Sequence, residues 1–460
     1  MNKLKRSINF FSTTKKKGLY KYLIESSILH ASRLSKKNVE INYLYKKTPS
    51  IKFLIIFIKE FFSFKIYNLT ECIKIKYNGI DLGLYAVSMT FRQPRSHSSK
   101  IFLYFNLTKY LFLGGSMVDS AKKIVNKVDA VYIDHAIYIH GIYYKLFADY
   151  KKIIYSNQYP RGLFYIDYKK KNSQISLPGK IFRLSKKIYT KNCKLIKKEK
   201  LIKAMRNTNT IPWVRNTKFK SKIKDEKILK NIDYIVYAHS FLDGNITYGY
   251  DGFITLKDWL IFTVDNLIKK NAKTVVKAHP NFYNNDFGEI AKTDKKIFEE
   301  IKEKYKYSDI IFMNEPIKNS ELLKKVKKKT ILITHHGTIA MEAGLFGFKC
   351  ISSASTFWDN SFDISNQWSD RNSYSKMIKK DWGQLKFANQ KDLLIFTSQL
   401  FSEYGNFGKK FWSNNFNKYI GNKHSFLLHK HTKRIKKSDQ GNLLNQIQKN
   451  IFELKYLNKK

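Results

Sequence analysis

The chain has 460 residues, 43% of them hydrophobic, and a formal net charge of +50 at pH 7. Its length exceeds one compact core and predicts two domains of roughly 200 residues each, while its apolar content excludes a disordered polymer. The charge has two readings: a lysine-rich composition that AT-rich coding produces, or an anionic partner such as a membrane surface, a nucleotide-activated substrate or an acidic polymer.

The cysteines and the N-terminus indicate the compartment. Cys72, Cys193 and Cys350 are too few and too scattered for a disulfide framework or a zinc site. The first 18 residues have no long apolar core and no small-residue cleavage site, so no secretory signal is expected. Both features predict a protein of the reducing cytoplasm.

The most apolar run is IKFLIIFIKEFFSF, at 51–64. It is only 14 residues long and contains Lys52, Lys59 and Glu60, so it falls short of the roughly 20 apolar residues that span a bilayer. It has two readings, a helix that lies in a membrane interface and a partly buried helix, and the second is favoured.

The rest of the first half alternates between strand and helix patterns. Apolar runs that end in glycine or polar turns predict strands at 101–107, 130–135 and 152–157. Helical patterns occupy 115–128 and 140–150. This alternation predicts parallel βαβ units, and the lysine-rich stretch 166–230 is interpreted as linker and surface.

The second half repeats the alternation more clearly. Strands are predicted at 232–240, 273–280, 329–334 and 347–353. Helices are predicted at 255–271, 320–328 and 339–346, with Thr255, Ser320 and Thr338 as their caps. This order predicts a doubly wound α/β domain, which binds ligands beyond the carboxyl ends of its strands.

Polar residues follow the strand that ends at Thr334. Gly337 allows the sharp turn or close approach needed there, and Thr338 begins a helix whose free amides favour phosphate. Glu342, about one turn into this helix, could accept hydrogen bonds from ribose hydroxyls. The alternative is an ordinary helix with an exposed glutamate.

Two further polar clusters lie at predicted strand ends of the same sheet. Lys277 and His279 end one strand, and His279 could donate to a phosphate oxygen or protonate a leaving group. His239, Asp243 and Asp251 lie in a glycine-rich loop after another. Each aspartate could act as a general base, orient a histidine, or form the turns typical of Asp-Gly pairs.

Three segments together resemble a known family: HSFLDGNITYGYDGFITLKDWL (239–260), VVKAHPN (275–281) and THHGTIAMEAGLFGFKCISS (334–353). They resemble the C-terminal half of bacterial surface-carbohydrate and capsule polysaccharide glycosyltransferases, including the Kdo-transferase-like capsule synthesis proteins. The resemblance covers about 232–360, and it extends more weakly to 78–92 and 134–156.

The resemblance implies a GT-B fold, in which two Rossmann-like domains face a cleft. The expected domains are 1–215 for the acceptor, 216–410 for the nucleotide sugar, and a basic helical tail at 411–460. The residues implied in donor binding are Lys277 and His279 at the phosphates, His336, Gly337 and Thr338 at the helix start, and Glu342 at the ribose or base.

The resemblance also suggests acceptor and base residues. Those expected near the acceptor are Asp134, His135, Tyr138 and Arg161. Bacterial sialyltransferases of this fold pair an Asp-Gly motif with a His-Pro motif; Asp251 could supply the aspartate here, with Asp243 as a rival. The chain departs from the usual pattern at His335 and His336, where a small or polar residue is expected, which bears on the identity of the donor.

The implied reaction moves a sugar from a nucleotide donor to a glycan hydroxyl. Asp251, Asp243 or His239 would take the hydroxyl proton, while cations and amides stabilise the departing phosphate. Because no Asp-x-Asp motif ends a strand, neither a metal ion nor a cofactor beyond the nucleotide-sugar donor is expected.

The acceptor would be a glycan or lipid-linked glycan. The basic segment 431–437 could place the protein peripherally on the inner face of the cytoplasmic membrane.

Three alternatives stay open. The first is a basic nucleic-acid-binding protein, although the lysines form no single stripe and no nucleic-acid motif is present, so no nucleic-acid partner is expected. The second is a glycan-assembly subunit without catalysis. The third is a phosphotransferase that moves a polyol phosphate from a CDP-activated donor, which would need a similar anion-binding site.

Overall fold

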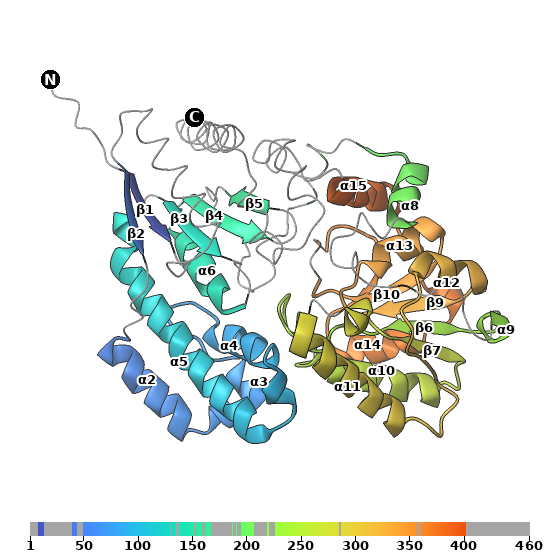
Figure 1. The fold of residues 1–460 in the computed structure, drawn as a ribbon, viewed down its shortest axis with the longest axis horizontal. Helices are drawn as coiled ribbons and strands as arrows, with labels where there is room; N and C mark the ends of the chain where they lie inside the picture. Colours follow the sequence, from blue (N-terminus) through green and yellow to red (C-terminus); the bar gives the residue numbers. More distant parts are fainter. Residues whose placement is uncertain are drawn as a thin grey trace.

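The computed structural model describes residues 8–12, 39–43, 49–128, 130–134, 138–150, 153–158, 162–166, 186, 190, 195–206, 219, 226–284, 287–356, 358 and 360–401. These residues form two α/β units, each built around one sheet (Figure 1). The predicted α/β class with two Rossmann-like doubly wound units is confirmed. The predicted tail at 411–460 and the basic segment 431–437 lie outside the described residues.

The first unit has a five-stranded sheet in the order β2-β1-β3-β4-β5. Its strands are β1 (Ile8–Ser12), β2 (Val39–Tyr43), β3 (Ala130–Asp134), β4 (Ile153–Gln158) and β5 (Gly162–Ile166). All neighbouring pairs are parallel except β4 and β5. The strands predicted at 130–135 and 152–157 are therefore confirmed.

Helices make up most of the described first unit: α2 (Ile51–Phe62), α3 (Leu69–Cys72), α4 (Leu82–Phe91), α5 (Lys100–Ile124) and α6 (Gly141–Asp149). The strand predicted at 101–107 is wrong, because these residues form the first turns of α5. A short apolar run has no periodicity that separates a strand from a buried helix. Here the run continues into buried positions at Tyr110, Leu111 and Met117, which only a helix brings to one core.

The long helix from Lys100 to Lys127, which is α5 with its short continuation, is the one described helix that is long and apolar enough to cross a membrane. Half of its apolar window is buried inside the protein. It packs against α2, α4 and α6, so it is also the central helix of the first core.

The second unit has a fully parallel six-stranded sheet in the order β11-β10-β9-β6-β7-β8. The strands are β6 (Tyr234–Tyr237), β7 (Thr274–Lys277), β8 (Ile311–Met313), β9 (Ile331–Thr334), β10 (Lys349–Ser353) and β11 (Asn366–Trp368). The chain runs outward in one direction from β6 to β8 and in the other from β9 to β11. The winding therefore reverses between β6 and β9, where doubly wound sheets bind their ligands.

Helices cover both faces of this sheet (Figure 1). They are α10 (Leu256–Lys269), α11 (Gly288–Lys304), α12 (Asn319–Lys325), α13 (Ile339–Phe346), α14 (Arg371–Lys379) and α15 (Gln390–Phe401). Thr255 caps α10 as predicted, by accepting from the Asp258 amide. The predicted cap Ser320 is wrong: α12 begins one residue earlier, so Ser320 lies inside it and is buried.

The second unit includes chain from before the predicted boundary at 215/216. In α8 (Lys198–Arg206), which contacts α13 and α15, Leu201 is buried in the second unit's core. The short α9 (Glu226–Leu229) follows. Part of the stretch that was interpreted as linker is therefore structural, because Leu201 is buried in this core and α8 packs on α13 and α15.

The loop after β6 makes contacts between the two units. After β6 the chain enters the first unit, where Ile246 packs in the first core and Thr247 Oγ1 lies 3.0 Å from Ser88 Oγ of α4. Ile246 has φ +44°, a left-handed conformation that a β-branched residue rarely adopts. The burial of its side chain in the neighbouring unit holds this conformation.

Candidate active site

Four histidines meet at the carboxyl edge of the second sheet, beside the point where the winding reverses. His239 follows β6, His279 follows β7, and His335 and His336 follow β9. The His239 ring centroid lies 4.2 Å from that of His336 and 6.1 Å from that of His279. The sequence predicted that His239, His279 and His336 would converge because parallel strands end at one edge, and the structure places them together.

His239 holds the turn between β9 and α13. Its Nε2 accepts from the His336 amide at 3.3 Å and lies 3.0 Å from Thr334 Oγ1, which in turn accepts from the Gly337 amide. Because an amide can only donate, the proton of the neutral ring lies on Nδ1. Burial and the neighbouring histidines lower the pKa of His239 well below its usual value. Its Nε2 is therefore occupied, which disfavours the predicted role as base.

α13 begins at Ile339 after Thr338, as predicted, but the amides that it leaves free differ from those expected. A Cβ on Gly337 would lie 2.6 Å from Thr334 Oγ1 and 3.2 Å from His239 Nε2, so the glycine serves close approach. Its amide, predicted to face phosphate, is bonded to Thr334. Thr338 occupies the N-cap position without a side-chain capping bond. In the described structure the amides of Thr338 and Ile339 have no acceptor, so these two are available to an anion.

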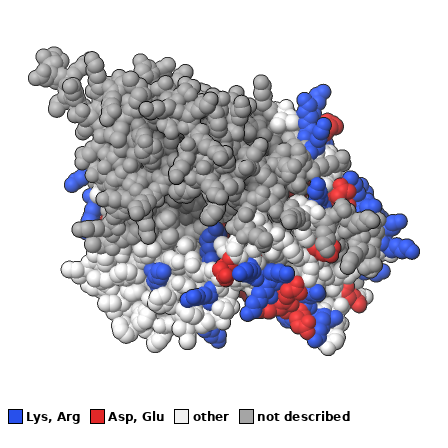
Figure 2. Space-filling model, viewed as in Figure 1, with Lys and Arg blue, Asp and Glu red and all other residues white. Residues whose placement is uncertain are grey.

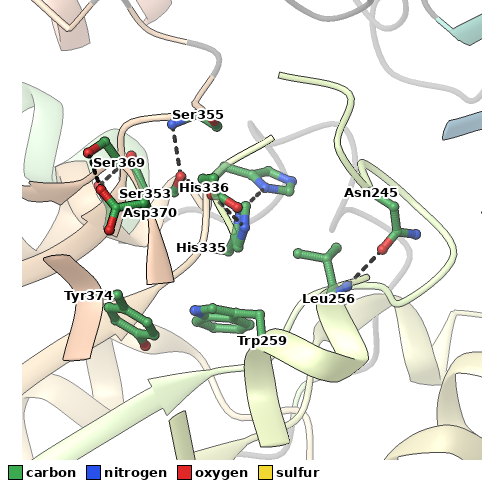
Figure 3. Close-up of polar contacts among 12 residues, drawn as sticks. Asn245, Leu256, Trp259, His335, His336, Ser353, Ser355, Ser369, Asp370 and Tyr374 are labelled. Atoms are coloured by element: carbon green, nitrogen blue, oxygen red, sulfur yellow. Dashed lines mark hydrogen bonds and ion pairs between the residues drawn. The ribbon is translucent and has the colours of Figure 1, made fainter. Parts of the chain in front are cut away.

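Asp251, His335 and His336 form a chain of hydrogen bonds, of which Figure 3 shows the two histidines and Ser353. Asp251 Oδ2 lies 3.0 Å from His335 Nε2 and also accepts from the Ser353 hydroxyl. His335 Nδ1 lies 2.9 Å from His336 Nδ1. Asp251 is buried, which disfavours the predicted role as a base in direct contact with an acceptor. Of its predicted roles, the geometry matches orientation of a histidine.

His336 is the last member of this hydrogen-bond chain, and it lies beside the loop that follows β6. It is partly exposed, and its Nε2 would lie 2.7 Å from a Cβ built on Gly244. The Tyr248 ring lies 5.1 Å away, centroid to centroid. Burial and His335 lower the pKa of His336 well below its usual value, although Asp243 opposes the shift. His336 is therefore neutral at neutral pH, the state that a general base requires.

His279 is a hydrogen-bond donor at neutral pH. Its Nδ1 accepts from the Asn281 amide at 3.2 Å, so the neutral ring carries its proton on Nε2. Burial, and then the charge of Lys277, lower the pKa of His279 to about 4. The ring can thus donate to a phosphate oxygen as predicted, but it is uncharged in the ligand-free protein.

Lys277, at the end of β7, and Glu342, in α13, are both buried, and each charge affects the pKa of the other. Burial lowers the pKa of Lys277 to about 8, and Glu342 partly offsets this. Burial raises the pKa of Glu342 to about 7, opposed by a 3.2 Å hydrogen bond from Asn319 and by Lys277. Glu342 is therefore paired with a side chain of α12, whereas the sequence predicted a ribose contact or an exposed carboxylate.

Asp243 is bound to the first unit. Its Oδ1 pairs with Arg92 Nη1 at 2.5 Å and accepts from the Tyr138 hydroxyl. That hydroxyl accepts in turn from Arg92, at 2.9 Å, and from the Gly244 amide, at 3.2 Å. Burial raises the pKa of Tyr138, and Asp243 adds to the shift. This ion pair disfavours Asp243 as the base and gives Tyr138, a predicted acceptor contact, a structural partner.

Two residues of this region were missed by the sequence analysis. Arg92 lies 151 residues before Asp243, and nothing in the local sequence links them. Asp294 on α11 accepts from Ser240 Oγ at 2.5 Å and from the Leu242 amide at 3.1 Å, and burial raises its pKa to about 7. A signal existed for Asp294, because this aspartate falls on the apolar stripe of its helix.

Three of the predicted acceptor side chains lie outside the part of the chain that the structure describes. Asp134 ends β3, but its side chain lies outside the description, as do His135 and Arg161. Among the residues that the structure does describe, no group of three or more His, Cys, Asp or Glu side chains is arranged to hold a metal ion.

Comparisons with known proteins give structural similarity without a sequence match. No protein-family model and no curated protein matches the chain. It is similar to "Thermosulfurimonas dismutans KpsC, beta Kdo 2,4 transferase", with a TM-score of 0.32 and 9% identity over 59% of this chain and 79% of that one.

Two further solved structures are similar. The apo structure of OtsA has a TM-score of 0.30 and 10% identity, over 86% of this chain and 95% of its own. An alpha,alpha-trehalose-phosphate synthase (UDP-forming) from Burkholderia xenovorans, in complex with glucose-6-phosphate, has a TM-score of 0.31 and 8% identity, over 90% and 100%. Similarity at this level assigns no activity or ligand to this chain, so its function has to be derived from its own residues.

Proposed function

We propose that this chain is a glycosyltransferase that moves a sugar from a nucleotide-activated donor to a hydroxyl group of a carbohydrate acceptor. One observation carries the proposal. At the winding reversal of a doubly wound sheet, uncharged phosphate donors and a carboxylate–histidine–histidine chain lie side by side. Such a site can hold a departing phosphate and accept a hydroxyl proton at the same time.

The donor phosphates would lie between His279 and the start of α13. The amides of Thr338 and Ile339 and the Nε2 proton of His279 are directed donors, and the positive end of the helix dipole adds to them. Lys277 is buried nearby and lowers the pKa of His279, so its positive charge acts on the same region. These groups would stabilise the charge that develops on the phosphate as the glycosidic bond breaks.

His336 would be the general base. Its Nε2 takes the proton of the acceptor hydroxyl as that oxygen bonds to the anomeric carbon and the nucleotide phosphate leaves. The Nδ1 proton of His336 can then pass to His335 Nδ1 across 2.9 Å. The positive charge comes to rest on His335 beside the Asp251 carboxylate, 3.0 Å away. Asp251 and His335 are thus positioning residues for His336.

The finer features of the function are also proposals. The acceptor would be a growing surface or capsular polysaccharide or glycolipid, made in the cytoplasm. The support is the motif pattern of the second unit together with a formal charge of +50, which suits anionic glycans and their carriers.

Transfer would not need a divalent ion, since amides and imidazoles supply the phosphate contacts. Retention of activity in a chelator would support this.

The test is sugar transfer by the purified full chain, with a panel of nucleotide sugars and oligosaccharide acceptors. We expect His336→Gln to lower kcat by about 10²–10⁴, the usual contribution of a general base, while donor binding changes little. The matched control is His97→Gln. This histidine, in the first unit, bonds to the Phe91 carbonyl and should be dispensable.

Two outcomes would contradict the proposal. Full activity of His336→Gln would remove the base assignment. Incorporation of a polyol phosphate with release of CMP, in place of sugar transfer, would identify a phosphotransferase.

A further inference from the structure

Helix α2 is apolar on two of its faces, and its charged residues are Lys52, Lys59 and Glu60. One stripe, formed by Phe53, Phe57 and Phe61, packs into the first core or against it. The opposite stripe, with the helical spacing i, i+4, i+7 and i+11, is exposed: Ile51 by 79%, Ile55 by 63%, Ile58 by 51% and Phe62 by 70%. A soluble helix normally places polar residues on this face, so the described protein leaves it without a partner.

The exposed stripe extends onto α5. Ile101, Phe105 and Phe112 share one face of that helix and are 80%, 63% and 37% exposed. Phe112 packs against Phe57, in the packed stripe of α2, with ring centroids 5.5 Å apart, so this face of α5 lies beside α2.

Phe64, which follows α2, is 69% exposed and has φ +56°, a conformation rare for aromatic residues. Together these side chains form an apolar face that is larger than scattered exposure explains.

The charges around the apolar face are positive. Between 50 and 112 the only acidic residues are Glu60, Glu71 and Asp81, and each is paired with a lysine, at 3.3, 2.6 and 3.2 Å. By contrast, Lys52, Lys59, Lys100 and Lys109 are exposed and form no ion pair with a described residue. Figure 2 shows this region, over α2 and α5 at the lower left, as mostly uncharged surface with isolated blue side chains.

We propose that α2 and the start of α5 dock on an anionic phospholipid bilayer. The exposed isoleucines and phenylalanines would enter the boundary between headgroups and acyl chains, and the unpaired lysines would contact lipid phosphates. At 12 residues, about 18 Å long, α2 is too short to cross the apolar core and would lie in the interface. Charge complementarity selects an anionic membrane over an uncharged apolar partner.

Vesicle sedimentation of the full chain, without donor or acceptor, tests the inference independently of the proposed activity. The probes are vesicles of phosphatidylcholine alone and of phosphatidylcholine with 30% phosphatidylserine. We expect binding to the anionic vesicles that weakens at 0.5 M salt. We expect Ile55→Gln/Ile58→Gln to weaken it at least tenfold, and Lys52→Gln/Lys59→Gln to weaken it by roughly fivefold per lysine.

Matched controls change equally exposed side chains elsewhere. Tyr307→Gln replaces an aromatic residue of the second unit that is 93% exposed, and Lys269→Gln/Lys273→Gln removes two of that unit's cations. These variants should bind like the original chain, and all variants should keep the thermal midpoint because the replaced side chains are largely exposed.

Three results would overturn the inference. One is equal binding to both kinds of vesicle, and another is unchanged binding by the isoleucine variant. The third is concentration-dependent dimerisation in the absence of lipid that Ile55→Gln/Ile58→Gln abolishes, because a second copy of the chain would then be the occupant of this face.

Discussion

The loop after β6 contains two Asp-Gly pairs whose aspartates differ in burial and in the unit that supplies their partners. Asp251 is buried, with 1% of its side chain exposed, and bonds to His335 within the second unit. Asp243 is 48% exposed and pairs with Arg92 of the first unit. Both pairs have the composition of an ordinary turn. The comparison shows that partners distant in the sequence decide which aspartate supports a histidine and which one joins the two units.

Substitution of each aspartate by asparagine tests this difference most strongly. Asp251→Asn removes the carboxylate beside His335, and we expect kcat to fall by about 10²–10⁴ because the charge formed in the relay loses its partner. Asp243→Asn should lower activity less than tenfold. The measurement is kcat for sugar transfer, with thermal unfolding as a check of the fold. Equal losses in the two variants would remove the functional distinction.

The two glycines that follow these aspartates, Gly244 and Gly252, lie against different neighbours. A Cβ on Gly252 would lie 2.6 Å from the Arg371 amide nitrogen, whereas on Gly244 it would lie 2.7 Å from the His336 ring. Both have positive φ, so alanine costs about 1–2 kcal/mol at either position. We therefore expect Gly252→Ala to lower the thermal midpoint further, and Gly244→Ala to act mainly on activity.

Gly347→Ala supplies the matched control, because its φ is +75° and open space surrounds the added Cβ. It should reproduce the backbone strain without the contact with His336. An activity loss in Gly347→Ala as large as that in Gly244→Ala would argue against a role for the loop at the base.

The pH dependence of nucleotide binding tests the role of His279. In the free protein burial holds the pKa of His279 near 4, so the ring is neutral. A bound phosphate would favour the imidazolium and raise that pKa, so binding would take up a proton. Affinity for a nucleoside diphosphate should then increase as pH falls from 7.5 to 5.5, by at most about tenfold per pH unit for one proton.

Calorimetry in buffers of different ionisation enthalpy measures the proton uptake directly. The effect should disappear in His279→Gln. Affinity that is independent of pH would place the phosphate away from this histidine.

The second unit could be predicted from sequence more completely than the first. Three of its strands, β6, β7 and β9, are short apolar runs followed by histidine, so these strands and the convergence of their polar ends were predictable. In the first unit, the run 101–107 was predicted as a strand but forms the first turns of α5. Pattern alone cannot tell an apolar helix buried on one side from a strand.

The roles of the site residues were less predictable than their positions. His239 was a candidate base, but its Nε2 accepts from the His336 amide, a contact that depends on the three-dimensional turn. Glu342 pairs with Asn319 and lies beside Lys277 because α12 and α13 pack on the same face of the sheet. Hydrogen-bond direction and burial, which decide these roles, follow from packing and leave no trace in residue spacing.

The strained Ile246 has a mechanical consequence. Its side chain is anchored in the first core, while Gly244, two residues earlier, rests against the ring of His336. A rotation of one unit relative to the other would therefore move residues 244–246 toward the imidazole of His336 or away from it. Closure around two substrates and alignment of the proton acceptor would then be a single movement.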